Sequence, residues 1–343
     1  MKFLDYLREE LEPQGPSPVA PLVIDLFAGC GGLALGFEAV GFETIGFEMA
    51  EDACETYAEN LRGECNCVTL TKETDLKVAP DIVIGGPPCQ PFSVGGLQMG
   101  SDDPRDGFPV FLACIEKYNP KIAMFENVRG MLYKGRHYLA DIAQFLEKLG
   151  YIVETQILQA IHFGVPQKRE RLFVVAHRGN WSFPQGTFFQ PVTAGEALAE
   201  LAYSIPENAK FLTPSMDRYV ANYERASQCV RPRDLHLNQP ARTLTCRNLN
   251  GATGDMMRIK LKDGRRRRLT VRESARLQGF PDWFRFCGTE GSQFNQIGNA
   301  VPPLLAKALA IEVRKCYDGP EHSRVEIDRI NRKHQQVLQL EMF

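Results

Sequence analysis

One cysteine of the chain follows directly on a short apolar strand and lies in a turn built from glycine and proline. Asp81-Ile82-Val83-Ile84 is typical of a buried strand, and Gly85-Gly86-Pro87-Pro88 carries the chain to Cys89, just beyond the carboxyl end of that strand. In an open α/β sheet, ligands bind at this edge. A thiol held there needs little more than positioning and a nearby positive charge to act as a nucleophile. The alternative is a buried structural cysteine, one of ten in the chain, but the rigid turn favours a reactive one.

A second junction between a strand and a helix has the glycines of a nucleotide-binding loop. The strand Leu22–Phe27 runs into Ala28-Gly29-Cys30-Gly31-Gly32, where glycines let a ligand approach the backbone at a helix N-terminus. Glu48 ends the next strand, where its carboxylate can accept hydrogen bonds from both hydroxyls of a ribose. Gly29-x-Gly31-x-x-Ala34 also satisfies the dinucleotide fingerprint. This segment therefore leaves a nicotinamide cofactor and S-adenosylmethionine both open.

Positive charge is concentrated in one stretch of a nearly neutral chain. Between Arg231 and Arg276 there are thirteen Lys or Arg residues against four acids, whereas the whole chain carries a formal charge of −2. Such a local excess is typical of a surface that binds nucleic-acid phosphates. The alternative is a solvated loop in which the run of arginines serves only solubility.

The elements that must position these residues follow the alternation of a doubly wound, mostly parallel α/β sheet. Helices are predicted over 139–149 with a stop at Gly150, from about Thr270 to Phe280, and over 301–313. We expect four parts: an N-terminal helix and linker (1–20), a catalytic and cofactor-binding domain (21–178 with 296–318), a smaller irregular recognition domain (179–295) and a C-terminal tail (319–343). The predicted strands are Leu22–Phe27, Thr44–Glu48, Asp81–Ile84, Ile122–Glu126, Ile152–Leu158 and Arg171–Ala176.

The composition is that of an ordinary soluble protein, with 44% hydrophobic and 24% charged residues. The N-terminus has no continuous apolar region of a signal peptide, and no stretch reaches the length of a membrane span. Ten cysteines without a secretory signal indicate reduced thiols in the cytoplasm. Cys65-Asn66-Cys67 has the wrong spacing for a zinc site, so no metal is expected.

Six segments resemble, in content and in order, the motifs of the DNA (cytosine-5)-methyltransferase family. The resemblance covers nearly the whole chain and implies a methyltransferase fold that takes a methyl group from S-adenosyl-L-methionine and leaves S-adenosyl-L-homocysteine. It also implies double-stranded DNA as the partner and a target-recognition domain that reads a short sequence. The six segments are Asp25–Gly32, Gly86–Ser93, Phe125–Val128, Gln167–Arg171, Arg268–Pro281 and Gln296–Pro303.

The resemblance implies a catalytic role for five residues. Cys89 would add to C6 of a cytosine, and Glu126 would protonate or hydrogen-bond ring N3. Asn127 would orient Glu126 or its loop, while Arg169 and Arg171 would hold the base's oxygen or its phosphate and favour the thiolate. The residues alone also allow Glu126 to be a surface ion-pair partner and the two arginines to belong to a strand edge.

The resemblance also implies a set of cofactor-binding residues. Glu48 and Met49 would contact the ribose and adenine, Asp75 would lie near the adenine amine, and Asn299 would belong to the closing motif. Asp75 could equally be a helix cap. The full predicted set is Asp25, Phe27, Gly29, Gly31, Gly32, Glu48, Met49, Asp75, Pro88 and Asn299.

A cytosine inside a duplex does not present these atoms, so the mechanism implies base flipping. The glycine-containing loop after Cys89 would close on the substrate, with Ser93, Gly95 and Gln98 against the DNA. Arginines of the basic stretch would contact base edges or phosphates. They are Arg242, Arg247, Arg265, Arg266, Arg267 and Arg268.

Two alternatives remain in view. The first is a tRNA cytosine-5 methyltransferase on nearly the same scaffold, although its Cys-Phe-Thr tripeptide is absent; Thr245-Cys246 only superficially resembles the Thr-Cys pair of another RNA class. The second is a non-catalytic DNA-binding module. We expect a prokaryotic modification enzyme that acts as a cytoplasmic, nucleoid-associated monomer. The sequence leaves open its target site and whether a cognate restriction endonuclease accompanies it.

Overall fold

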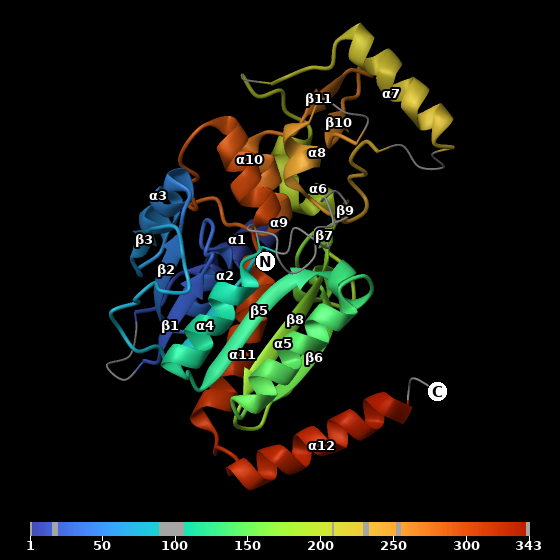
Figure 1. The fold of residues 1–343 in the computed structure, drawn as a ribbon. Coiled ribbons are helices and arrows are strands. Elements are labelled where there is room, and N and C mark those ends of the chain that lie inside the picture. Colours follow the sequence, from blue (N-terminus) through green and yellow to red (C-terminus); the bar gives the residue numbers. More distant parts are fainter. Residues whose placement is uncertain are drawn as a thin grey trace.

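A seven-stranded sheet forms the centre of the molecule (Figure 1). The computed structural model describes residues 2–15, 20–88, 106–207, 209–228, 233–251 and 255–340, with side chains up to residue 333. The strand order is β3-β2-β1-β4-β5-β8-β6, and β8 runs antiparallel to both of its neighbours while the other pairings are parallel. The predicted mostly parallel α/β sheet is confirmed. The strands are β1 (Leu22–Leu26), β2 (Glu43–Glu48), β3 (Cys65–Cys67), β4 (Ile82–Gly85), β5 (Ile122–Val128), β6 (Ile152–Gln159) and β8 (Glu170–His177).

All six predicted strands are present, with ends within two residues of those expected. The sequence did not predict β3, because its three residues lie at the sheet edge with little burial and so carry no apolar signal. The predicted helix stop is also confirmed, since Gly150 takes a left-handed backbone (φ 91°) after the helix ends.

Alternate strand residues face two different layers of helices, as a sheet buried on both sides requires. Val23 and Ile82 pack with one layer, whereas Ile24 and Val83 pack with the other. The first layer contains α1 (Phe3–Leu11), α2 (Gly32–Glu38) and α11 (Pro303–Asp318); the second contains α4 (Phe108–Tyr118) and α5 (Arg136–Lys148) (Figure 1). α3 (Glu51–Asn60) packs on β2 and β3 beside them, and α12 (Arg324–Leu340) contacts β6.

The segment after β8 is made of short elements, as expected for residues 179–295. The pairing of β7 with β9 joins it to the sheet domain, and β10 pairs with β11 in a separate antiparallel ribbon. The expected boundary between residues 295 and 296 falls inside a continuous helix, α10, so it does not separate two folding units at that point. β7 (Gln167–Lys168) precedes β8. The elements that follow β8 are α6 (Ala194–Leu198), α7 (Pro214–Ala226), β9 (Ala241–Arg242), α8 (Cys246–Asn250), β10 (Arg258–Lys260), β11 (Arg266–Arg268), α9 (Val271–Gln278) and α10 (Glu290–Asn299).

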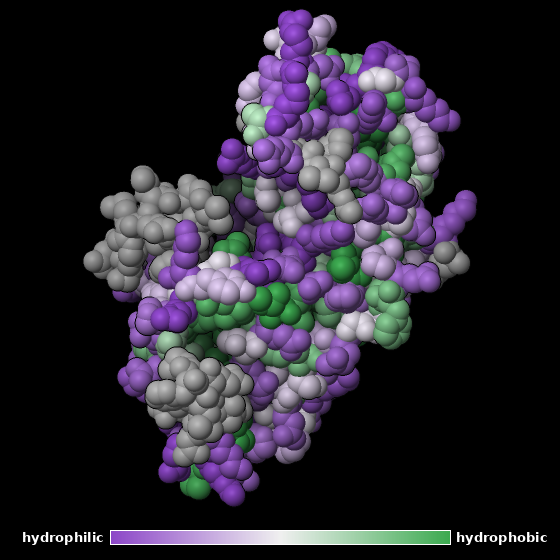
Figure 2. Space-filling view, turned by 90° about the vertical axis from the view of Figure 1, so that its right-hand side faces the viewer, coloured by the Kyte–Doolittle hydropathy of each residue, from purple (hydrophilic) through white to green (hydrophobic). Residues whose placement is uncertain are grey.

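A hydrophobic cluster connects this recognition segment to the sheet domain. It joins Ala34 and Leu35 of α2 to Leu277 of α9 and Ile297 of α10. Seen from the side, the segment forms an upper lobe with a mostly hydrophilic surface, set off from the larger body by an indentation (Figure 2). Within the described residues, no helix is both long and apolar enough to cross a membrane.

Candidate active site

Two side chains at the end of β5 lie beside the chain that leads to Cys89. Asn127 Nδ2 donates to the carbonyl oxygen of Pro87 at 3.2 Å, and a Cβ at Gly86 would lie 3.9 Å from Glu126 Oε2. Cys89 itself lies outside the described residues, as do Ser93, Gly95 and Gln98. The parallel pairing of β4 with β5 produces this approach, because both strands end at the same edge of the sheet.

Glu126 forms a close ion pair with one of the two predicted arginines. Arg171 Nε lies 2.7 Å from Glu126 Oε1, and the two side chains are only 13% and 12% exposed, respectively. The antiparallel register of β5 and β8 places Arg171 opposite Val128, two residues beyond Glu126. The pair holds the carboxylate in place while its other oxygen faces Gly86. A carboxylate so placed can exchange a proton with a base held beside it.

Arg169 has a different role from the one the sequence predicted. It is almost fully buried, and its guanidinium donates to the carbonyl oxygens of Leu244 at 2.9 Å and Gly298 at 3.3 Å. Burial, with the neighbouring charge of Arg171 as a smaller cause, lowers the pKa of Arg169 to about 9. Arg169 therefore ties the backbone at Leu244 to the backbone at Gly298 of α10, and it also lines a cavity.

A cavity of about 560 Å³ opens at the ends of β5, β6 and β8. Lys168 and Thr243 line this cavity and were not predicted as site residues. In the sequence, only their position next to Arg169 and Arg242 could have indicated a role. The cavity combines residues of the sheet domain with one from the recognition segment, as a substrate site between two domains requires. Its lining is Val128, Arg129, Gly130, Gln159, Ile161, Lys168, Arg169, Glu170, Arg171 and Thr243.

The predicted cofactor loop has the backbone that its glycines allow. Gly29 and Gly31 have φ values of 54° and 83°, and Phe27 has a left-handed φ of 59° as well. A side chain at Gly31 would also meet the Tyr57 ring at 2.7 Å. Gly29 N donates to Glu48 Oε2 at 2.9 Å, so the carboxylate at the end of β2 is tied to the loop. Its other oxygen accepts from the backbone nitrogens of residues 49 and 50.

Asp25 is a buried carboxylate beneath this loop. Its Oδ2 has no hydrogen-bond partner among the described residues. Burial first, and the charge of Glu48 second, raise the pKa of Asp25 to about 8, although a backbone hydrogen bond from Ala34 lowers it. An unpaired buried acceptor at a strand end fits a ligand that brings a donor group.

The other predicted cofactor residues lie in separate surroundings. Met49 is 68% exposed beyond β2. Asp75 accepts hydrogen bonds from Tyr118 Oη at 2.6 Å and Lys117 Nζ at 3.2 Å, and these two partners lower its pKa. Asn299 Oδ1 accepts from the thiol of Cys246 at 2.9 Å. Gly32 lies at the start of α2, where a Cβ would meet the carbonyl oxygen of residue 301 at 2.6 Å, and the carbonyl oxygen of Pro88 accepts from Gly107 N at 3.0 Å.

Most arginines of the basic stretch are engaged inside the recognition segment. Arg267 and Glu273 form an ion pair at 2.6 Å with neither side chain exposed, so the Arg267 guanidinium is engaged inside the protein. Arg266 pairs with Asp217 and Asp234, both at 3.0 Å. The stretch therefore carries much less free positive charge than its composition indicates.

The remaining predicted arginines vary in how far they are free. Arg242 pairs with Asp255 at 2.8 Å, and Arg268 donates to the carbonyl oxygen of Leu249 at 2.9 Å. Arg265 is 55% exposed, although it pairs with Asp263 at 2.7 Å. Arg247 of α8 is exposed. Arg247 and Arg265 remain the arginines of this set that are best placed to meet phosphate.

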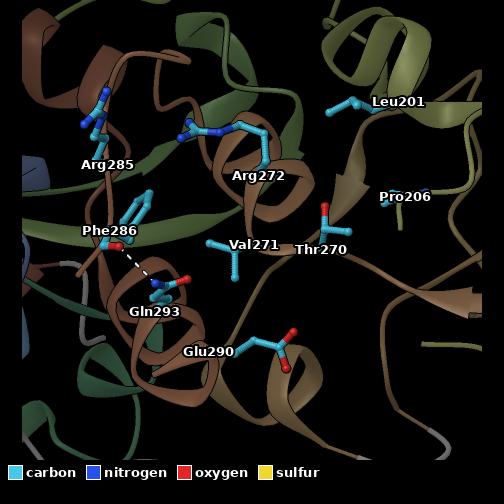
Figure 3. Close-up of a pocket in the computed structure, with 9 residues that line it drawn as sticks. All are labelled: Leu201, Pro206, Thr270, Val271, Arg272, Arg285, Phe286, Glu290 and Gln293. Carbon is cyan, nitrogen blue, oxygen red and sulfur yellow. Dashed lines mark hydrogen bonds between the residues drawn. The ribbon is translucent and has the colours of Figure 1, made fainter. Parts of the chain in front are cut away.

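A larger cavity, of about 720 Å³, lies within the recognition segment and is lined in part by α9 and α10. Its apolar floor includes Val271 and Phe286, and Gln293 Nε2 donates to the backbone oxygen of Phe286 at 2.9 Å (Figure 3). Arg272 lies along the rim, but its guanidinium already donates to two backbone oxygens. No residue predicted for catalysis or for the cofactor lines this cavity, so it is not the site of the chemistry.

The sheet order, with an antiparallel strand beside its end and a glycine loop at its carboxyl edge, places the chain in the methyltransferase fold class. Two solved structures share this fold: Spodoptera frugiperda DNMT2, with a TM-score of 0.66, 17% identity and coverage of 87% of this chain and 99% of that one; and the Entamoeba histolytica methyltransferase EhMeth, with a TM-score of 0.67, 19% identity and coverage of 86% and 98%.

The sequence comparisons define the family. The model of the C-5 cytosine-specific DNA methylase family matches residues 22–315. The Type II methyltransferase M.AplI of Arthrospira platensis is 58% identical over 93% of each chain, and M1.HphI of Haemophilus parahaemolyticus is 34% identical over 85% of this chain and 86% of its own. The chain belongs to the C-5 cytosine-specific DNA methylase family and is an enzyme that methylates DNA. In the described residues, no group of side chains could hold a metal ion.

Proposed function

We propose that this enzyme extrudes a cytosine from duplex DNA, adds the thiolate of Cys89 to C6, and transfers a methyl group to C5 within a specific short sequence. The observation that carries the proposal is the position of Glu126. Its carboxylate pairs with Arg171 and lies beside Gly86, three residues before Cys89. Because β4 and β5 are parallel neighbours, a proton donor at the end of β5 and a nucleophile just beyond β4 would share one edge of the sheet.

The chemistry needs both groups because C5 of cytosine is a weak nucleophile. When the thiolate bonds to C6, Glu126 delivers a proton to N3, and the ring electrons become available at C5 as an enamine. After C5 has gained the methyl group, it loses its proton to a base. The electrons of that C–H bond re-form the C5–C6 double bond and expel the thiolate, and N3 returns its proton to Glu126. Arg171 supports the first step through its positive charge, which favours anionic groups nearby.

Members of this family use S-adenosyl-L-methionine, which supplies an electrophilic methyl group. The residues at the carboxyl ends of β1 and β2 fit it. Glu48 lies at a strand end suited to ribose hydroxyls, and the unpaired Oδ2 of Asp25 suits a ligand donor. Phe27 of this loop has its ring beside Gly107, where a Cβ would lie 2.9 Å from Phe27 Cζ. We also propose that the enzyme acts as a monomer in the cytoplasm.

Base recognition is assigned to the segment 179–295 and substrate closure to the residues after Cys89. The cavity of about 560 Å³ supports the first assignment, since Thr243 of this segment lines it together with Arg171 of the sheet domain. Lys168 adds a cation at its rim, which suits the phosphate of an extruded nucleotide.

The test measures transfer of labelled methyl groups from S-adenosyl-L-methionine to unmethylated duplex DNA and, separately, to tRNA. We expect label in DNA, none with Cys89→Ser, and full activity with Cys287→Ser, a free cysteine outside the site. Bisulfite sequencing of the product then gives the target site. Label in tRNA alone, or retained transfer by Cys89→Ser, contradicts the proposal.

A further inference from the structure

Pro88 and Gly107, the residues on either side of the segment that contains Cys89, are in direct contact. Gly107 N donates to the carbonyl oxygen of Pro88 at 3.0 Å. A Cβ at Gly107 would lie 2.5 Å from Pro88 Cδ and 2.9 Å from Phe27 Cζ, so only glycine fits there without movement. Phe27 belongs to the cofactor loop. Residues 88 and 107 therefore meet directly beside the cofactor site.

The residue before this meeting point is a buried carboxylate with two well-defined contacts. Asp106 Oδ1 accepts from the backbone nitrogen of Phe108 at 3.1 Å, which fixes the start of α4. Asp106 Oδ2 accepts from the hydroxyl of Tyr138, a residue of α5. A hydrogen bond to an ionised acceptor is about twice as strong as a neutral one. The carboxylate thus fastens the returning chain to two helices.

A row of aromatic rings continues this connection to the catalytic carboxylate. Tyr138 meets Phe108 edge to face, with ring centroids 5.7 Å apart, and Phe108 meets Phe125 in the same way at 5.0 Å. Phe125 directly precedes Glu126 in β5. Packed rings in this arrangement resist displacement. The anchor of the returning chain and the position of Glu126 are therefore mechanically linked.

We propose that Asp106 and Tyr138 are positioning residues for the thiol nucleophile, an inference that rests on the proposed function. The attacking sulfur must come within about 3–3.5 Å of C6, and a loss of about 1 Å in placement costs about 100-fold in rate. Asp106 holds the backbone next to Gly107, and Gly107 N holds the carbonyl oxygen of Pro88, the residue that directly precedes Cys89. The motif that identified the nucleophile, Gly86–Ser93, does not include either residue.

The test uses Tyr138→Phe, which removes only the hydroxyl and keeps the ring against Phe108. The rate of covalent adduct formation is measured with duplex DNA carrying 5-fluorocytosine at the site found by bisulfite sequencing. We expect this rate and kcat to fall about 10- to 100-fold, with KM for S-adenosyl-L-methionine and the Kd for DNA within about twofold of wild type. Tyr317→Phe, which removes the hydrogen bond from a tyrosine hydroxyl to Asp81 just before the start of β4, is the matched control and stays at the wild-type rate.

A second variant separates positioning from general damage. Asp106→Asn alone is expected to slow adduct formation as Tyr138→Phe does, and the double variant to be slower by less than the product of the two effects, because the two residues share one hydrogen bond. An unchanged adduct rate in Tyr138→Phe overturns the inference. A slower adduct rate that is accompanied by a lower Tm and weaker DNA binding also overturns the inference, because it indicates a general structural role. A different result would contradict the proposed function itself: either the wild type forms no adduct, or Cys89→Ser still forms one.

Discussion

The carboxyl edge of the sheet and the basic stretch 231–276 differ in how they use charge. At the sheet edge, Glu126 and Arg171 form a pair beside the chain that leads to Cys89. In the basic stretch, Arg267 forms a pair with Glu273 that has no exposed surface at all. The same kind of ion pair therefore has a proposed role in chemistry in one region and a role in cohesion in the other.

The surroundings of each pair explain the difference. Glu126 keeps one oxygen directed at Gly86, where no side chain intervenes. Glu273 uses both oxygens on Arg267, and one of them also caps α9 through Thr270. A carboxylate whose lone pairs are all occupied by the protein has none left for a substrate. Glu126 and Glu273 thus differ in the hydrogen bonds that the described residues make to them, although neither is exposed and both are paired with arginine.

The largest effect is expected at the sheet edge. Glu126→Gln keeps the shape of the side chain but cannot supply the N3 proton, so kcat should fall by about 100- to 10,000-fold. The Tm should change little, because Gln can still accept from Arg171. Steady-state methyl transfer and thermal unfolding measure the two quantities. If kcat falls by less than about tenfold, Glu126 is not the acid, and its role no longer differs from that of Glu273.

The next largest effect is expected on stability, in the basic stretch. Arg267→Ala leaves the Glu273 charge buried without its partner, which costs about 3–5 kcal/mol in the free energy of unfolding. The double variant Arg267→Met with Glu273→Gln removes both charges and should recover most of that loss. Urea unfolding measures both. If Arg267→Ala is as stable as wild type and only DNA binding weakens, the arginine faces DNA and our structural assignment is wrong.

The two regions also differ in what the sequence could predict. Strand ends and glycine turns constrain the backbone, so Gly29, Gly86 and Glu126 were placed correctly relative to the sheet from spacing alone. The arginines were counted as charge, and a count cannot show that Asp234 lies beside Arg266 until the chain between them folds. Arg169 was misjudged for the same reason, since its partners Leu244 and Gly298 are 75 and 129 residues away in the chain.

A pH dependence is expected from the cofactor end of the sheet. The pKa of Asp25 is about 8 in the folded chain and about 4 when unfolded, so between these values the folded state binds one more proton. This group's contribution to stability therefore falls as pH rises through that window and levels off above pH 8. Without cofactor, Asp25→Asn should raise Tm at pH 8.5 by about 2–4 °C for each kcal/mol recovered.

At pH 5 the same substitution should change Tm much less, because the folded wild type is then already protonated at Asp25. Thermal unfolding at the two pH values provides the measurement, and equilibrium binding of S-adenosyl-L-methionine should weaken in the variant at both. An equal Tm difference at pH 5 and pH 8.5 contradicts the raised pKa. Asp25 would then resemble Glu273 of the basic stretch, a buried carboxylate whose oxygens are all hydrogen-bonded within the protein.

The smallest effect is expected from Arg265→Ala, two residues from Arg267. Arg265 is 55% exposed and its pair with Asp263 is a surface one, so the free energy of unfolding should change by less than about 1 kcal/mol. If its guanidinium meets a phosphate, the slope of log Kd for DNA against log salt should fall by about one. Titrations at several salt concentrations measure this slope, with Arg285→Ala, another exposed arginine, as the control. An unchanged slope in Arg265→Ala means that Arg265 contributes neither to stability nor to phosphate contact. In that case Arg247 is the remaining exposed arginine of the predicted set that can contact DNA.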